Sequence, residues 1–99
     1  MAPSDTAIRV TVELFGLPRL RCGQAEVTLT LPLYPGRRQL VTALAQACPG
    51  LVGHGLRPDL ADLDEGYVLN RNGVTFLGAG ELALEDGDAL LLISSQAGG

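Results

Sequence analysis

Hydrophobic and polar residues alternate along the first third of the chain. Apolar residues occupy every second position from Ile8 to Leu14 and again from Val27 to Leu31. This period of two is typical of a strand with one buried face. The stretch from Leu17 to Gln24 contains Pro18 and Gly23 and is predicted to be a loop. The two alternating segments are therefore predicted to pair as a hairpin.

The period then changes to that of a helix. Hydrophobic residues from Leu40 to Cys48 recur at helical spacing, between Pro35-Gly36 and Pro49-Gly50. One helix of about three turns is therefore predicted after the hairpin. Residues 51–66 contain glycines, a proline and four acidic residues, and we expect a loop there with at most a short helical turn.

The last third of the chain predicts short strands again. Residues 67–69 and 74–77 flank the turn signal Asn72-Gly73, which predicts a second hairpin. Residues 85–88 read as a tight turn that leads into an apolar final strand, Ala89 to Ile93. This order predicts an α+β fold, a mixed sheet of four to five strands with one main helix packed on one face.

A single helix covers only one face of such a sheet. In the final strand Ala89, Leu91 and Ile93 point one way, whereas Leu90 and Leu92 point the other way. One apolar row is therefore left without cover by the helix. An uncovered apolar row is typical of a docking surface, and we favour a partner protein as its cover. The loop at residues 51–66 or a second copy of the chain is the alternative.

The sequence ends in Ala97-Gly98-Gly99, directly after the final strand. Glycine has no Cβ, so a Gly-Gly end can enter a tunnel that no branched residue would pass. Six extended residues span roughly 20 Å, enough to carry the terminal carboxylate into a neighbouring active site. We predict a flexible segment at residues 1–7, a folded domain at 8–93 and a flexible tail at 94–99. A frayed or artificial terminus is the alternative interpretation.

Composition limits the possible classes of protein. The chain has 99 residues, 46% of them hydrophobic, which suits one domain with one core. Its net charge is −4, all seven cations are arginines, and no basic run is interleaved with aromatic residues. We therefore expect no nucleic-acid partner, and an acidic body suggests a partner with a basic groove. No signal peptide and no membrane-length apolar run is recognised, so we expect a cytoplasmic protein without membrane contact.

No set of residues predicts an enzyme site. Cys22 and Cys48 fit neither a redox motif nor a zinc site, and we expect two free thiols. His54 lies between two glycines and is expected to be exposed; a Cys-His pair would need a third group to orient it. The acidic residues of 59–65 lack the ligand spacing of a calcium loop, so a solvated face is expected and no metal site.

Three segments, taken in order, resemble the MoaD/ThiS family of ubiquitin-like β-grasp sulfur carriers. They are Leu84 to Asp88, the strand Ala89 to Ile93, and Ala97-Gly98-Gly99; weaker support comes from residues 40–44 and 48–51. The resemblance covers residues 8–99. It implies that an adenylating enzyme transfers AMP from ATP to the Gly99 carboxylate, and that sulfur then replaces AMP to give a C-terminal thiocarboxylate. Gly98 and Gly99 would provide the narrow reactive end, and the chain would be a carrier substrate that binds no cofactor itself.

The resemblance also implies two partners, the ATP-dependent adenylating enzyme and a larger acceptor such as the molybdopterin synthase large subunit. Molybdopterin biosynthesis is the pathway we favour, with thiamine, cysteine or RNA thiolation pathways as alternatives. A protein modifier conjugated through Gly99 and a passive interaction module are the other two classes. We expect the partner to contact Phe15, Leu90, Leu91, Leu92, Ile93, Gln96 and Ala97.

Overall fold

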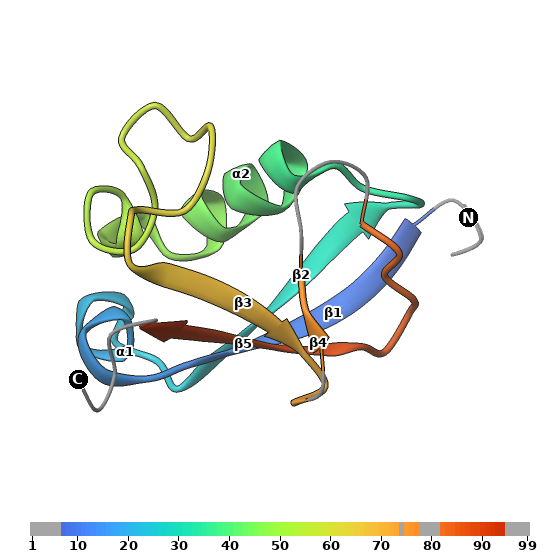
Figure 1. Cartoon of the computed structure of the whole chain (residues 1–99), viewed down its shortest axis with the longest axis horizontal. Helices are drawn as coiled ribbons and strands as arrows, with labels where there is room; N and C mark the ends of the chain where they lie inside the picture. The colour runs from blue at the N-terminus through green and yellow to red at the C-terminus, as the bar shows by residue number, and fades with distance from the viewer. Residues whose placement is uncertain (1–6, 74, 78–81, 95–99) are drawn as a thin grey trace.

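The computed structural model describes residues 7–73, 75–77 and 82–94. Five strands form one mixed sheet, and helix α2 lies across one of its faces (Figure 1). The strands are β1 (Ala7–Leu14), β2 (Glu26–Pro32), β3 (Tyr67–Arg71), β4 (Thr75–Phe76) and β5 (Ala89–Ser94). The helices are α1 (Gly16–Cys22), α2 (Arg37–Ala47) and the short 3-10 helix η2 (Pro49–Leu51). The predicted α+β class is therefore confirmed. Ala7 and Ser94, which were expected in the flexible ends, belong to strands.

The sheet has the strand order β2-β1-β5-β3-β4. β1 and β2 pair antiparallel, which confirms the predicted first hairpin. β5 runs parallel to β1 in the middle of the sheet, with Leu14 opposite Leu92, and antiparallel to β3 on its other side. Because the two are parallel, the end of β5 lies beside the end of β1 and beside α1 (Figure 1).

The core fills the space between the sheet and α2. Leucine and valine side chains of β1, β5 and β3 meet Leu40, Val41 and Leu44 of α2, and all three of these helix residues are fully buried. Leu51, Leu56 and Leu63 extend the same core, so the loop at residues 51–66 covers the part of this face that α2 does not reach. Each buried leucine contributes about 1.5–3 kcal/mol of transfer free energy.

Residues 16–22 form helix α1, so the loop predicted there is wrong. Pro18 lies in the first turn, where the missing amide hydrogen costs no helical hydrogen bond. Gly23 ends the helix in the left-handed conformation and donates its N–H to the carbonyl of Arg19. The proline and the glycine are therefore a helix start and a helix stop, at a helix too short for its period to show in the sequence.

Cys22 and Cys48 form a disulfide, so the prediction of two free thiols is wrong. Cys22 ends α1 and Cys48 follows the last residue of α2, and their Cα atoms lie 5.2 Å apart. η2 packs closely on α1, and only a glycine fits at position 50: a Cβ there would lie 2.2 Å from the carbonyl oxygen of Arg21. The sequence separation of 26 residues gives no sign of this contact, which only the hairpin and the returning helix create.

Asp59 and Glu65 are exposed, as expected for a solvated face, whereas Asp62 and Asp64 hold the loop at residues 51–66 in place. Asp62 accepts a 2.6 Å hydrogen bond from Nε of Arg37, and Asp64 accepts one of 3.0 Å from the amide of Gly55. Burial raises the pKa of Asp62, but hydrogen bonds from Arg37 and the amide of Leu63 outweigh it and leave that pKa below its usual value. The loop is therefore tied to the first turn of α2.

Candidate docking surface at the end of β5

The two side-chain rows of β5 have different environments. Leu90 and Leu92 are 0% exposed beneath α2 and the loop at residues 51–66. Their predicted role in partner binding is therefore wrong, because their side chains belong to the core. Leu91 and Ile93 lie on the opposite face of the sheet and are partly exposed, while Ala89 in the same row is exposed. The predicted uncovered row is this one, and its role in binding stays a prediction.

Phe15 lies on the same outer face as Ile93. It is extended, with φ −132° and ψ 150°, so it continues the alternation of β1 and points to the side opposite Leu14. Since Leu14 pairs with Leu92, Phe15 is placed beside Ile93. β3 adds Val68, which is partly exposed directly opposite Ile93. We call these four residues the outer patch: Phe15, Val68, Leu91 and Ile93.

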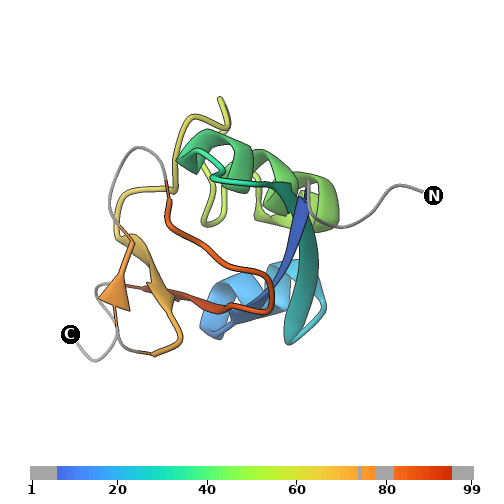
Figure 2. The ribbon, with the colours of Figure 1, turned by 90° about the vertical axis from the view of Figure 1, so that its right-hand side faces the viewer.

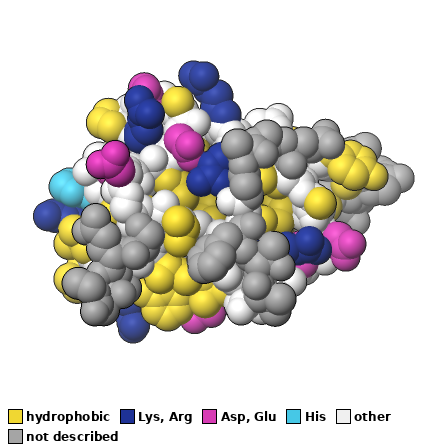
Figure 3. Space-filling model, viewed as in Figure 1, with side chains coloured by type: hydrophobic (Ala, Val, Ile, Leu, Met, Phe, Trp, Pro, Cys, Tyr) yellow, Lys and Arg dark blue, Asp and Glu magenta, His cyan; other side chains and the backbone are white. Residues whose placement is uncertain are grey.

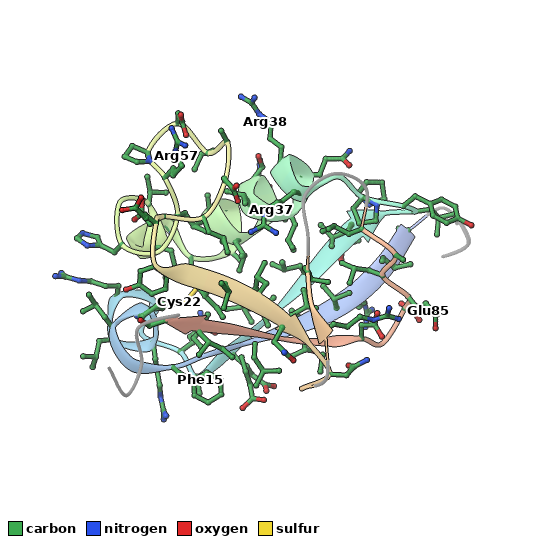
Figure 4. All side chains as sticks on the ribbon, viewed as in Figure 1. Phe15, Cys22, Arg37, Arg38, Arg57 and Glu85 are labelled. Carbon is green, nitrogen blue, oxygen red and sulfur yellow. A yellow bond between two sulfur atoms is a disulfide. The ribbon has the colours of Figure 1, made fainter. Side chains whose placement is uncertain are left out.

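The outer patch includes a well exposed aromatic side chain. Phe15 is 42% exposed. In Figure 3 hydrophobic side chains gather in the lower part of the view, the region where Figure 4 labels Phe15. Beside the patch, α1 exposes Leu17 and Leu20 at 45% and 78%. No sequence signal assigned these two leucines to a surface, because their segment was predicted to be a loop.

One pair of acidic residues lies on the outer face next to the patch. Glu13 of β1 is directly opposite Glu26 of β2, and both side chains are exposed. Within the described part of the chain neither glutamate forms an ion pair. Like charges in opposite positions of an antiparallel pair are destabilising. A partner that brings a cation to this point would relieve the repulsion, which agrees with the expected basic groove.

The start of β5 is fixed by Asp88. Its carboxylate accepts a 2.8 Å hydrogen bond from the amide of Glu85 and pairs with Nε of Arg71 at 2.8 Å, while Asn72 donates to its other oxygen. Burial raises the pKa of Asp88, but these hydrogen bonds and the Arg71 charge outweigh it, so its pKa lies below the usual value. Asp88 therefore shapes its turn, as predicted, and sets the position of the strand that carries Leu91 and Ile93.

The remaining predicted site residues, Gln96, Ala97, Gly98 and Gly99, lie outside the described residues. β5 ends at Ser94, so the chain leaves the described sheet at the outer patch and beside α1 (Figure 1). Any partner bound to this patch therefore stands next to the point where the tail begins.

The other candidate chemistry leads to no site. His54 is exposed, as predicted, and a Cys-His pair is excluded because both cysteines are in the disulfide. The described residues contain no group of three histidine, cysteine or acidic side chains placed to hold a metal ion. Within the same residues, no helix has the length and apolar character needed to cross a bilayer.

Comparison with known proteins identifies the fold. No family model and no curated protein matches the sequence. The structure is similar to the crystal structure of SAMP1 from Haloferax volcanii, with a TM-score of 0.76 and 24% identity over 92% of this chain and 99% of that one. It is also similar to small archaeal modifier protein 1 of Methanosarcina acetivorans, with a TM-score of 0.72 and 21% identity over 94% and 98% of the two chains.

A third similar structure is a Pyrococcus furiosus protein assigned as molybdopterin converting factor subunit 1, with a TM-score of 0.65 and 22% identity over 88% of this chain and 97% of that one. Together these structures show that the chain has the ubiquitin-like β-grasp fold of the MoaD/ThiS type. At these identities the likeness concerns the fold.

Proposed function

We propose that this chain is a carrier protein whose C-terminal carboxylate, on Gly99, is activated by a partner enzyme and carries sulfur as a thiocarboxylate. The observation that supports it most is the position of the outer patch at the end of β5. The docking area and the start of the tail adjoin, so one bound partner can hold the domain and receive the last residues of the chain. Holding a reacting group in this way replaces a bimolecular encounter with a step inside one complex.

The chemistry proposed for Gly99 uses groups of the partners, not of this chain. The carboxylate attacks the α-phosphorus of ATP, pyrophosphate leaves, and an acyl-adenylate forms. The terminal sulfur of a persulfide then attacks the acyl carbon and AMP leaves, and a thiol cleaves the resulting acyl disulfide to release the thiocarboxylate. Gly98 and Gly99 contribute steric freedom only. The chain is accordingly proposed to be a substrate or a non-catalytic subunit, with ATP bound by the activating enzyme.

Within this proposal the acceptor we favour is the larger subunit of a molybdopterin synthase. The similarity to the Pyrococcus furiosus protein assigned as molybdopterin converting factor subunit 1 supports this choice. Sulfur transfer to thiamine, to cysteine or to RNA uses the same activated end. The large protein that co-purifies with this chain distinguishes among these pathways, since each pathway has a different acceptor enzyme.

A second candidate function is conjugation of Gly99 to the amines of other proteins. It is favoured by two of the similar structures, whose names describe small archaeal modifier proteins. The chain has no lysine, so it would be attached to other proteins without forming lysine-linked chains of its own. Digestion of cellular protein would then yield Gly-Gly remnants on lysines of the targets, which sulfur transfer alone does not produce.

The docking part of the proposal is tested with a charge placed in the outer patch. Ile93→Asp is expected to weaken binding to the adenylating enzyme about tenfold or more, since a residue central to an interface contributes about 2 kcal/mol. Tyr34→Asp is the matched control, because it adds the same charge at a residue 70% exposed in the segment between β2 and α2. Equal binding by both variants, with the fold of each intact, would remove the outer patch from the proposal.

The cytoplasmic location expected from the sequence also stays a proposal, and the disulfide gives a way to test it. Disulfides persist in oxidising compartments and are rare in the cytosol of most mesophilic organisms. Trapping cellular thiols with an alkylating reagent before lysis measures whether Cys22 and Cys48 are paired in the cell. A fully alkylated pair agrees with a reducing cytoplasm, and a protected pair points to an oxidising environment.

A further inference from the structure

Strand β2 forms one edge of the sheet, and its outer backbone groups have no partner among the described residues. The amide of Leu14 donates to the carbonyl of Ala25, which makes that pair a hydrogen-bonded one. Such pairs alternate along an antiparallel ladder, so the odd-numbered residues of β2 bond to β1. The N–H and C=O groups of Thr28 and Thr30 therefore point to the open edge, and the described residues provide no partner for them.

A groove of about 380 Å³ lies between this edge and α2. Arg38, Thr42 and Gln46 follow one another at every fourth position of α2 and form its helical wall. Leu31 of β2 and the small side chain of Ala43 form the apolar part of the lining, and Thr30 stands at the strand side. Figure 2 shows α2 above β2, at the edge of the sheet opposite β4. The groove thus combines free backbone groups with a shallow apolar floor.

The positive charge of the groove favours an acidic ligand. Arg38 is exposed, extends outward from α2 (Figure 4), and forms no ion pair among the residues that the structure describes. Among the described residues no acidic side chain lines the groove, although the chain as a whole has a net charge of −4. The groove therefore attracts an acidic ligand more strongly than an uncharged one. A second copy of the chain is disfavoured, because it would bring two bodies of charge −4 together.

We propose that the groove between β2 and α2 binds an extended peptide segment of a partner protein, which adds a strand along Thr28–Thr30 and places a carboxylate against Arg38. Main-chain hydrogen bonds to the edge provide affinity, and the alternate side chains that face α2 provide specificity. Small β-branched side chains suit the space over Ala43 and Leu31.

This site is separate from the outer patch. β1 separates β2 from β5 in the sheet, and the Pro32 end of β2 lies far along the molecule from the end of β5 (Figure 1). The bound peptide would therefore leave both the outer patch and the exit of the tail accessible. The chain can then be recruited by one protein through β2 while a second one acts on its C-terminus.

The test uses two synthetic peptides, acetyl-Asp-Val-Thr-Val-Thr-Val-amide and the same sequence with Asn in place of Asp, titrated into the ¹⁵N-labelled full chain. The Asp peptide is expected to shift the amide signals of Thr28 and Thr30 and to slow their hydrogen exchange. Arg38→Gln should weaken this peptide about two- to fivefold, as for an exposed ion pair, and leave the Asn peptide unchanged. Arg57→Gln is the matched control, because Arg57 is exposed and pairs with Asp59 away from the groove.

A backbone variant tests the edge itself. Thr30→Pro removes an amide hydrogen that faces the open edge and spares the ladder to β1, so the domain is expected to fold and to lose both peptides. If Thr30→Pro does not fold, slowed exchange of the Thr28 and Thr30 amides in the unaltered chain decides the question. Shifts confined to β3 and β5, no shifts at all, or self-association of the chain through β2 would each overturn the proposal.

Discussion

Reduction of the disulfide between Cys22 and Cys48 is expected to lower the free energy of unfolding by about 3.5 kcal/mol. The bond closes a loop with a sequence separation of 26 residues, which contains all of β2 and α2. Cross-linking a loop of this length removes about 12 cal/mol/K of conformational entropy from the unfolded chain. The free energy of unfolding of a domain of this size is about 5–15 kcal/mol. The reduced protein should therefore stay folded, but with a much smaller free energy of unfolding.

The measurement is urea denaturation of the same protein with and without a phosphine reductant, followed by circular dichroism. In thermal scans of the same samples the melting temperature should fall by roughly 14–28 °C on reduction, given about 4–8 °C per kcal/mol for a small domain. A Cys22→Ala/Cys48→Ala double variant provides the control, because it lacks the bond and should not respond to the reductant. Unfolding of the oxidised and reduced proteins at the same urea concentration, or two titratable thiols in the purified protein, would show that the disulfide does not stabilise the domain.

Three further predictions concern packing, pH and charge. Gly50→Ala should lower the free energy of unfolding by about 1–3 kcal/mol, because the new Cβ would lie 2.2 Å from the carbonyl oxygen of Arg21 and overpack this contact. Gly36→Ala is the control in the same denaturation assay. Its Cβ would lie 3.7 Å from the nearest atom, on the side chain of Gln39, so the loss of stability should be smaller. Because the folded pKa of Asp88 is lowered, its stabilisation is complete above the unfolded pKa near 3.8 and is lost as the pH falls through the folded value. Asp88→Asn should therefore flatten the loss of stability as the pH falls below about 4, and an equal slope for both proteins would contradict this. Glu13→Lys should slow association with the adenylating enzyme and reduce its dependence on salt, with stopped-flow rates as the measurement.

The first hairpin, α2 and the final strand could be predicted from the sequence. In each of them the hydrophobic residues are spaced as the buried face of a strand or helix requires. Val10 and Val12 alternate with polar residues and face the core, and Leu40, Val41 and Leu44 recur at helical spacing for the same reason. Leu90 and Leu92 could not be separated from Leu91 and Ile93, because both rows of β5 are apolar. Only the position of α2 and of the loop at residues 51–66 decides which row is covered.

α1 and the disulfide could not be predicted because neither has a local signal strong enough. α1 has seven residues, and its Pro18 resembles a loop residue unless the start of the helix is already known. The contact between Cys22 and Cys48 is tertiary, and so is the pairing of Arg37 with Asp62. The groove beside β2 likewise depends on the distance between a strand and a helix that no periodicity specifies.

We propose that this chain reacts through the carboxylate of Gly99, which the folded domain presents to its partners. The most direct test of this proposal is the intact mass of the full chain after incubation with the adenylating enzyme, ATP and a persulfide donor. The mass should rise by the difference between one sulfur and one oxygen atom, and fragmentation should locate this gain on the last peptide; the gain should be absent when Gly99 is deleted. An unchanged mass with an adenylating enzyme that is active on another carrier, or sulfur found on a residue other than Gly99, would contradict it.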